Sequence, residues 1–179
     1  MQGFADFIQR AVGILPSFIS LVVAFCLIAG ITLIVRGVMI AGSYGDVETR
    51  YAGTGVKTSI YVHLIVGALL ISLPTSISSF LQTFFAQPTA PAASEIFAYA
   101  PDMLEPVSHD QAREIVIALL RCVQFFGLLG FVRGLFLLNQ APVRPGNGLV
   151  GKGATHLVGG VLAMNIVMFV GMIEDLVVG

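Results

Sequence analysis

Residues 34–39 read IVRGVM, and residues 131–136 read FVRGLF. Each hexapeptide places an Arg-Gly pair inside a long apolar run. An arginine in the middle of a bilayer costs at least about 2.5–3.5 kcal/mol, so the same placement twice needs an explanation. Only 11% of the 179 residues are charged and 56% are hydrophobic, whereas soluble domains carry about 25% charged residues. The composition therefore predicts an integral membrane protein.

The two Arg-Gly pairs belong to longer similar segments. Each is followed by a turn and then by a glycine-rich segment with one histidine, GVKTSIYVHLIVG in the first half and GLVGKGATHLVGG in the second. Arg36 and Arg133 are 97 positions apart, whereas His63 and His156 are 93 positions apart. This spacing predicts an internal duplication in which both copies have the same orientation and the second turn is shorter.

Four apolar stretches are long enough to cross a bilayer, which takes about 20 residues. The predicted fold is all-α and integral to the membrane, with four transmembrane helices that form two tandem helical hairpins of the same orientation. The predicted spans are residues 14–41, 56–85, 113–140 and 153–175. They divide the chain into an interfacial amphipathic segment 1–13, a first transmembrane hairpin 14–85, a Pro-rich outward-facing loop 86–112 and a second transmembrane hairpin 113–179.

Basic residues gather at the two hairpin turns and their flanks. They are Arg36, Arg50, Lys57, Arg133, Arg144 and Lys152. The positive-inside rule places both turns in the cytoplasm, so that the termini and the loop 86–112 face the periplasm of a bacterial inner membrane. These side chains either anchor the helices by reaching lipid headgroups or face a lumen in an assembly. Both interpretations remain open at this point.

Arg121 has no counterpart in the first half, where Ala24 stands at the equivalent position. It precedes Arg133 by 12 residues, or about 18 Å along a helix, which places it inside the bilayer. A buried charge of this kind is expected to have a partner. The acidic residues that could reach it are Glu114, Glu174 and Asp175. Arg121 is either one half of a structural ion pair or a functional charge.

Small and polar residues on the predicted spans indicate close helix packing. The small residues form faces of the GxxxG type, which let helix backbones approach in lipid. They are Gly127, Gly130, Gly134, Gly159, Gly160 and Ala163. Polar side chains predicted to form hydrogen bonds between helices are His63, His156, Gln124 and Asn165. For the two histidines, a bond to a turn carbonyl and a proton relay are the alternatives.

The sequence contains no convincing catalytic or metal-binding pattern. GNGLVGKG at 146–153 fits GxGxxG and part of the Walker A motif, but Gly153 stands where a Ser or Thr is needed and no strand precedes the motif. We therefore expect a tight basic turn there. Cys26 and Cys122 are expected to be small packing residues. The chain is not expected to be an enzyme, to hold a cofactor or a metal, or to bind nucleic acid in a sequence-specific way.

The two Arg-Gly segments and the glycine-rich entry GNGLVGKGATHLVGG resemble a known family. It is the group of small four-span membrane proteins of type IVB secretion and IncI-type conjugation systems, the IcmC/DotE and TraQ group. The resemblance covers the two predicted hairpins. It implies a membrane component of an apparatus that transfers DNA or protein between cells, with other secretion-system membrane proteins as partners.

Each half is also similar to a conjugative pilin, which is a two-helix hairpin with outward termini and a basic cytoplasmic turn. That likeness implies a homo-oligomer or filament, basic turns that face a lumen, phospholipid bound between subunits, and an extracellular pilus as a second location. Pilins usually carry a cleaved leader, which this sequence is not expected to have. The alternative function is a small ion or solute channel or transporter subunit that uses Arg121, His63 and His156.

Overall fold

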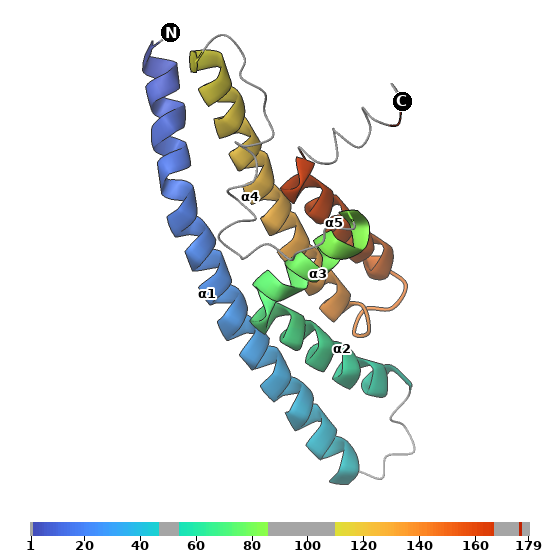
Figure 1. Ribbon diagram of the computed structural model, residues 1–179. Helices are drawn as coiled ribbons and strands as arrows, with labels where there is room; N and C mark the ends of the chain where they lie inside the picture. The colour runs from blue at the N-terminus through green and yellow to red at the C-terminus, as the bar shows by residue number, and fades with distance from the viewer. Residues whose placement is uncertain (1, 47–53, 86–109, 167–175, 177–179) are drawn as a thin grey trace.

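The computed structural model describes residues 2–46, 54–85, 110–166 and 176. Apart from the turn at residues 141–148, these ranges are mainly helical, and they contain no strand. The helices are α1 (Gln2–Asp46), α2 (Thr54–Ile71), α3 (Leu73–Phe85), α4 (Asp110–Gln140) and α5 (Leu149–Met164), as Figure 1 shows. The all-helical fold that the sequence predicts is therefore confirmed for the described residues. The loop 86–112 lies almost entirely outside them.

Two of the helices are long and apolar enough to cross a membrane. The candidate spans are Gly13–Ser43 in α1 and Ala118–Gln140 in α4. α2 and α3 make a third only if the two are counted as one bent span, and α5 is a shorter apolar helix. The described residues thus hold two or three candidate spans rather than the predicted four. The predicted fourth span, 153–175, extends past the described residues.

α1 is a single helix of 45 residues. At 1.5 Å per residue it is about 68 Å long, roughly twice the hydrocarbon thickness of a bilayer. It runs without interruption through Pro16, so residues 2–13 continue the first predicted span and form no separate helix. Whether this end lies along the membrane interface stays a prediction.

The prediction of one continuous helix over residues 56–85 is wrong. The chain divides at Ser72 into α2 and α3, and their axes are bent by 95°. Pro74 supplies the physical reason. It has no N–H to bond the carbonyl of Leu70, and its ring would clash with that carbonyl in a continuing helix.

Serine hydroxyls bond backbone carbonyls at this bend. Ser76 donates from Oγ to the carbonyl of Leu69 at 3.1 Å, across the bend. Ser72 donates from Oγ to the carbonyl of Ala68 at 2.8 Å. Such bonds matter because the last carbonyls of a helix otherwise lack partners. At this bend the Ser76 hydroxyl therefore supplies a partner for the carbonyl of Leu69.

α5 ends at the position equivalent to this bend. The helix stops at Met164, and Asn165 has φ −117° and ψ 37°. Asn165 follows Ser72 by 93 positions, the same offset that separates the two histidines. The residue equivalent to Pro74 is Val167, so the second interruption occurs without a proline.

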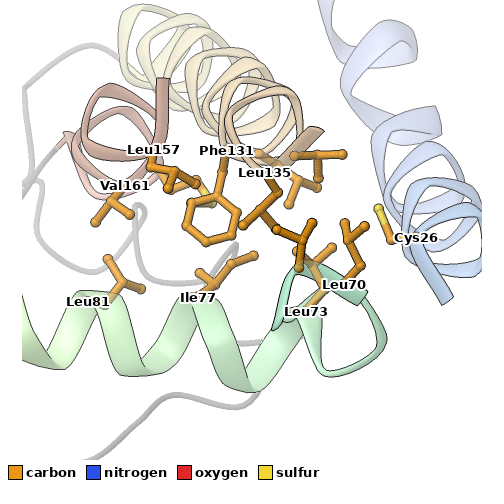
Figure 2. Close-up of a cluster of buried hydrophobic side chains, with 13 residues drawn as sticks. Cys26, Leu70, Leu73, Ile77, Leu81, Phe131, Leu135, Leu157 and Val161 are labelled. Carbon is orange, nitrogen blue, oxygen red and sulfur yellow. The ribbon is translucent and has the colours of Figure 1, made fainter. Parts of the chain in front are cut away.

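The helices pack mainly as two pairs, α1 with α2 and α4 with α5. α1 and α4 both begin at the same end of the molecule (Figure 1). One cluster of buried apolar side chains joins the pairs. Its fully buried centre is Phe131 of α4, whose ring meets Phe80 of α3 edge-on at a centroid distance of 5.3 Å. Figure 2 shows this cluster, to which α1 contributes Cys26, α3 contributes Ile77 and α5 contributes Val161.

Candidate functional site: the glycine contacts and the polar groups of the helix pairs

α1 and α2 approach closely at Gly30 and Gly67. A Cβ on Gly30 would lie 2.7 Å from the carbonyl oxygen of Gly67, and a Cβ on Gly67 would lie 2.9 Å from that of Gly30. Two turns along α1, a Cβ on Gly37 would lie 3.2 Å from the Cβ of His63. Such distances leave no room for a side chain at Gly30 or Gly67. The two backbones are therefore in direct contact, as in closely packed membrane helices.

α4 and α5 approach in the same way at Gly127 and Gly160. A Cβ on Gly127 would lie 2.8 Å from the carbonyl oxygen of Gly160, and a Cβ on Gly160 would lie 2.7 Å from that of Gly127. Gly30 and Gly127 are 97 positions apart, and Gly67 and Gly160 are 93 positions apart. These are the offsets of the two arginines and of the two histidines. The contacts of the two helix pairs therefore match position by position.

The predicted glycine faces divide into close and open positions. Gly127, Gly134 and Gly160 are in tight contact across the α4–α5 pair. Gly130 is not, because its nearest neighbour would be 3.8 Å from a Cβ, and Gly159 would meet nothing within 4 Å. Ala163 is half-buried beside Gly127. Gly30, Gly37 and Gly67 were not predicted as packing residues. They could have been, because in the repeat they are equivalent to Gly127, Gly134 and Gly160.

Each repeat histidine bonds a carbonyl one turn earlier in its own helix. His63 is 3% exposed, and its Nδ1–H donates to the carbonyl of Ser59 at 2.7 Å. His156 is half-buried, and its Nδ1–H donates to the carbonyl of Lys152 at 2.9 Å. Both bonds are intrahelical, whereas a bond to a neighbouring helix or to a turn carbonyl was expected. They fix each ring to its own helix.

Basic side chains at the two turns are exposed. These are Arg36, Lys57, Arg133, Arg144 and Lys152, whereas Arg50 lies outside the described residues. Arg36 follows Gly30 by six residues, and Arg133 follows Gly127 by six, which is about 9 Å along the helix. The two arginines therefore stand at the same distance from the glycine contact of their own pair.

Three polar atoms of α4 are buried without a hydrogen-bond partner among the described residues. They are Nε of Arg121, Oε1 of Gln124 and Oδ1 of Asn139. Gln124 is 2% exposed and Arg121 is half-buried. Of the expected partners of Arg121, Glu174 and Asp175 lie outside the described part of the chain. Asn165, also predicted to bond another helix, donates its backbone N–H to the carbonyls of Val161 and Leu162 at the end of α5.

The first three residues of the glycine-rich segment 146–153 lie in a turn, and the rest belong to α5. Gly146 has φ 91° and Gly148 has φ 62°, values in the left-handed region that glycine adopts most readily. α5 begins immediately afterwards at Leu149, and a helix rather than a strand precedes the turn. The arrangement is that of a connection between two helices and lacks the strand of a phosphate-binding loop.

The described residues contain no group of three or more His, Cys, Asp or Glu side chains that could hold a metal ion. Cys26 and Cys122 are free thiols, and Cys26 is buried in the apolar cluster.

No family model matches the chain, and no curated protein or solved structure matches it either. The features that stand out in the structure are therefore the glycine contacts and the surfaces of the two helix pairs.

Proposed function

We propose that this chain is a structural membrane subunit made of two tandem helical hairpins with the same orientation. The observation that carries the proposal is the matched pair of glycine contacts, Gly30 with Gly67 and Gly127 with Gly160. Two hairpins that pack through the same positions are expected from duplication of one membrane-inserting unit. The polar side chains near these contacts serve to hold or anchor helices.

In the proposed arrangement the chain crosses the membrane four times. α2 has 18 residues and is about 27 Å long, close to the hydrocarbon thickness of about 30 Å. After the 95° bend, α3 lies along the outer surface. Its exposed side chains are Thr75, Ser79, Gln82 and Thr83, and its buried apolar side chains are Leu73, Ile77 and Leu81. α5 takes the place of α2 in the second hairpin.

We assign the subunit to a type IVB secretion or conjugation apparatus in the bacterial inner membrane. The sequence resemblance and the exposed basic residues at both turns support this assignment. The subunit is pilin-like and self-assembling, with its basic turns facing the cytoplasm or a lumen and phospholipid bound beside the protein contacts between subunits. It supports the transfer of DNA or protein and carries out no reaction itself. In a pilus it would also occur outside the cell.

Reporter fusions test the four-span arrangement. A reporter that is active only in the periplasm is fused after residue 48, after residue 100, after residue 146 and at the C-terminus. We expect activity at residue 100 and at the C-terminus and none at the other two positions. Activity at residue 48 or at residue 146 would exclude two same-orientation hairpins.

Gene deletion and biochemical fractionation test the role in transfer. Deletion is expected to abolish transfer of DNA or protein, and the intact gene supplied in trans is expected to restore it. Filaments sheared from cells and detergent extracts of the inner membrane are then probed for the protein. Normal transfer after deletion would refute the assignment to the apparatus. A monomer in mild detergent, together with absence from sheared filaments, would refute self-assembly.

A small channel or transporter is the alternative, and one observation favours it. Nε of Arg121 is buried without a partner among the described residues. Such an unpaired charge inside a membrane protein is expected in an ion or substrate pathway, where it would bind an anion. This alternative predicts ion or solute flux into proteoliposomes that Arg121→Ala abolishes. Flux no greater than that of empty liposomes would eliminate it.

A further inference from the structure

The contact between the two helix pairs is not symmetric. α1 is equivalent to α4 and α2 is equivalent to α5 in the repeat. α1 and α2 both pack against α4, whereas α1 and α5 make at most marginal contact within the described ranges. A two-fold relation would match every α2–α4 contact with an α1–α5 contact. The first pair therefore meets the second through a different surface, which is a heterologous contact.

One side of this contact is an apolar surface of α4 that we call the receiving face. It consists of Phe125, Leu128, Val132, Leu135 and Phe136. The rings of Phe125 and Phe18 of α1 are 6.4 Å apart, and those of Phe136 and Phe25 are 6.3 Å apart. Leu128, Val132 and Leu135 are buried in the shared cluster. Figure 2 shows Leu135 on the side of α4 that meets α1 and α2.

The equivalent surface of α1 is apolar but uncovered. Subtracting 97 from each number of the receiving face gives Ile28, Ile31, Val35, Val38 and Met39. All five side chains are exposed, with Ile31 at 48% and Val38 at 57%. Their counterparts on α4, Leu128 and Leu135, are 1% and 0% exposed. α1 therefore carries a second receiving face with nothing on it in the single chain.

The other side of the internal contact, which we call the docking face, also has an uncovered equivalent. On the first pair it includes Val22, Cys26, Val62 and Val66, all of which are buried or half-buried. Their equivalents on the second pair, at offsets of 97 for α1 and 93 for α2, are Leu119, Val123, Thr155 and Gly159, and all four are exposed. The second pair thus carries a surface equivalent to the docking face, and no other part of the described chain packs against it.

We propose that a second copy of this chain packs its uncovered docking face on α4 and α5 against the uncovered receiving face on α1. This intermolecular contact repeats the contact between the two halves of one chain. It rests on the proposed self-assembling function and identifies the partner and the surface. Heterologous contacts close into rings or continue as filaments. Because α1 and α4 begin at the same end of the molecule, successive copies have the same polarity. Each contact also shifts one pair along the helix direction of the other, since Phe25 meets Phe136, which is equivalent to Met39.

The two uncovered faces also fit each other in size. The receiving face on α1 carries five bulky side chains, whereas the docking face on α5 has Thr155 and Gly159, where the first pair has Val62 and Val66. A Cβ on Gly159 would meet nothing within 4 Å. Small residues on one helix let another approach closely in lipid. Lipid covering both faces is the competing outcome, and the experiment below separates the two.

A cysteine cross-link tests the contact directly. Phe25 and Phe136 are neighbours in the internal contact. In the repeat, Cys122 is equivalent to Phe25 and Met39 is equivalent to Phe136. Met39→Cys is therefore expected to face the native Cys122 of the next copy. Two differently tagged copies, one with Met39→Cys and Cys122→Ala and one with Cys122 retained, are co-expressed in membranes, both with Cys26→Ala. A short bis-maleimide is expected to link the two tags. The control is Ile40→Cys in place of Met39→Cys, about 100° around the helix, and it is expected to link far less.

A substitution on the docking face provides the second variant. Gly159→Leu is expected to reduce the cross-link at least tenfold, because the new side chain occupies the place of the receiving face. Gly151→Leu is the matched control. A Cβ there also meets nothing within 4 Å, and its equivalent, Thr58, is exposed in the first pair. The control is expected to cross-link as well as the parent.

The mass of the parent protein in mild detergent, from light scattering, separates failure of this contact from failure of self-assembly. An oligomer with the Met39–Cys122 link supports the proposal. An oligomer in which positions 39 and 40 link equally, or not at all, overturns the proposed contact while self-assembly stands. A monomer with no link in membranes overturns both.

Discussion

Gly30 of α1 and Gly67 of α2 are in backbone contact, and a Cβ on either would lie within 2.9 Å of the other's carbonyl oxygen. Gly127 and Gly160 repeat this relationship in α4 and α5. Lipid tails are as apolar as leucine, so membrane helices gain little from burying apolar area against each other and depend on close packing. The four glycines are therefore positions at which the stability of each helix pair is sensitive to substitution.

The first prediction concerns two glycines on the same helix. Gly127→Ala is expected to lower the free energy of unfolding by about 1–3 kcal/mol, because the new methyl group overlaps the backbone of α5. Gly130→Ala is expected to be neutral or slightly stabilising, since its Cβ would be 3.8 Å from the nearest atom and alanine favours helix. Unfolding in detergent with increasing SDS, followed by circular dichroism, measures both. Equal effects would contradict the assigned contact.

A second prediction concerns the bend between α2 and α3. Ser76→Ala removes the hydroxyl that donates to the carbonyl of Leu69 and is expected to cost about 1 kcal/mol. Ser79→Ala is the control, because Ser79 is exposed and its hydroxyl bonds only a carbonyl of its own helix. The same SDS titration compares the two variants. A control as destabilised as Ser76→Ala would show that the bond across the bend contributes nothing specific.

The two repeat histidines are expected to differ in their contribution to stability. His63 is 3% exposed and packs against Gly37, whereas His156 is only half-buried. His63→Ala should therefore destabilise the protein by about 2 kcal/mol more than His156→Ala, through the cavity it leaves. Thermal unfolding of the two purified variants at one detergent concentration tests the difference. The reverse order would show that burial does not determine their roles.

Gln124 is the best position for a stabilising substitution. Its Oε1 is buried without a partner among the described residues, and a buried unsatisfied acceptor costs about 1–3 kcal/mol. Leu27 occupies the equivalent place in the first half, so Gln124→Leu is expected to raise the free energy of unfolding by about 1 kcal/mol. Gln140→Leu, at the exposed end of α4, should be neutral. Destabilisation by Gln124→Leu would reveal a partner for the amide.

The sequence by itself predicted the helical class of the protein, its candidate spans and its repeat pattern. A chain with 11% charged residues has too few of them to cover a water-facing surface, so the membrane was the remaining environment. Uninterrupted apolar runs located the candidate spans within α1 and α4, because a spanning helix must satisfy its own backbone hydrogen bonds over about 20 residues. Arg36 and Arg133 are 97 positions apart, and His63 and His156 are 93 positions apart. The glycine contacts repeat at the same two offsets.

Only the tertiary structure decided where the helices bend and which apolar faces are covered. Pro74 was visible in the sequence, but proline is tolerated in many membrane helices, so its effect depended on Ser76 and on the packing of α3. Leu128 and Ile31 occupy equivalent positions with similar side chains, yet one is 1% and the other 48% exposed. An apolar side chain suits lipid and protein equally well, and only the arrangement of the helices determines which of the two covers it.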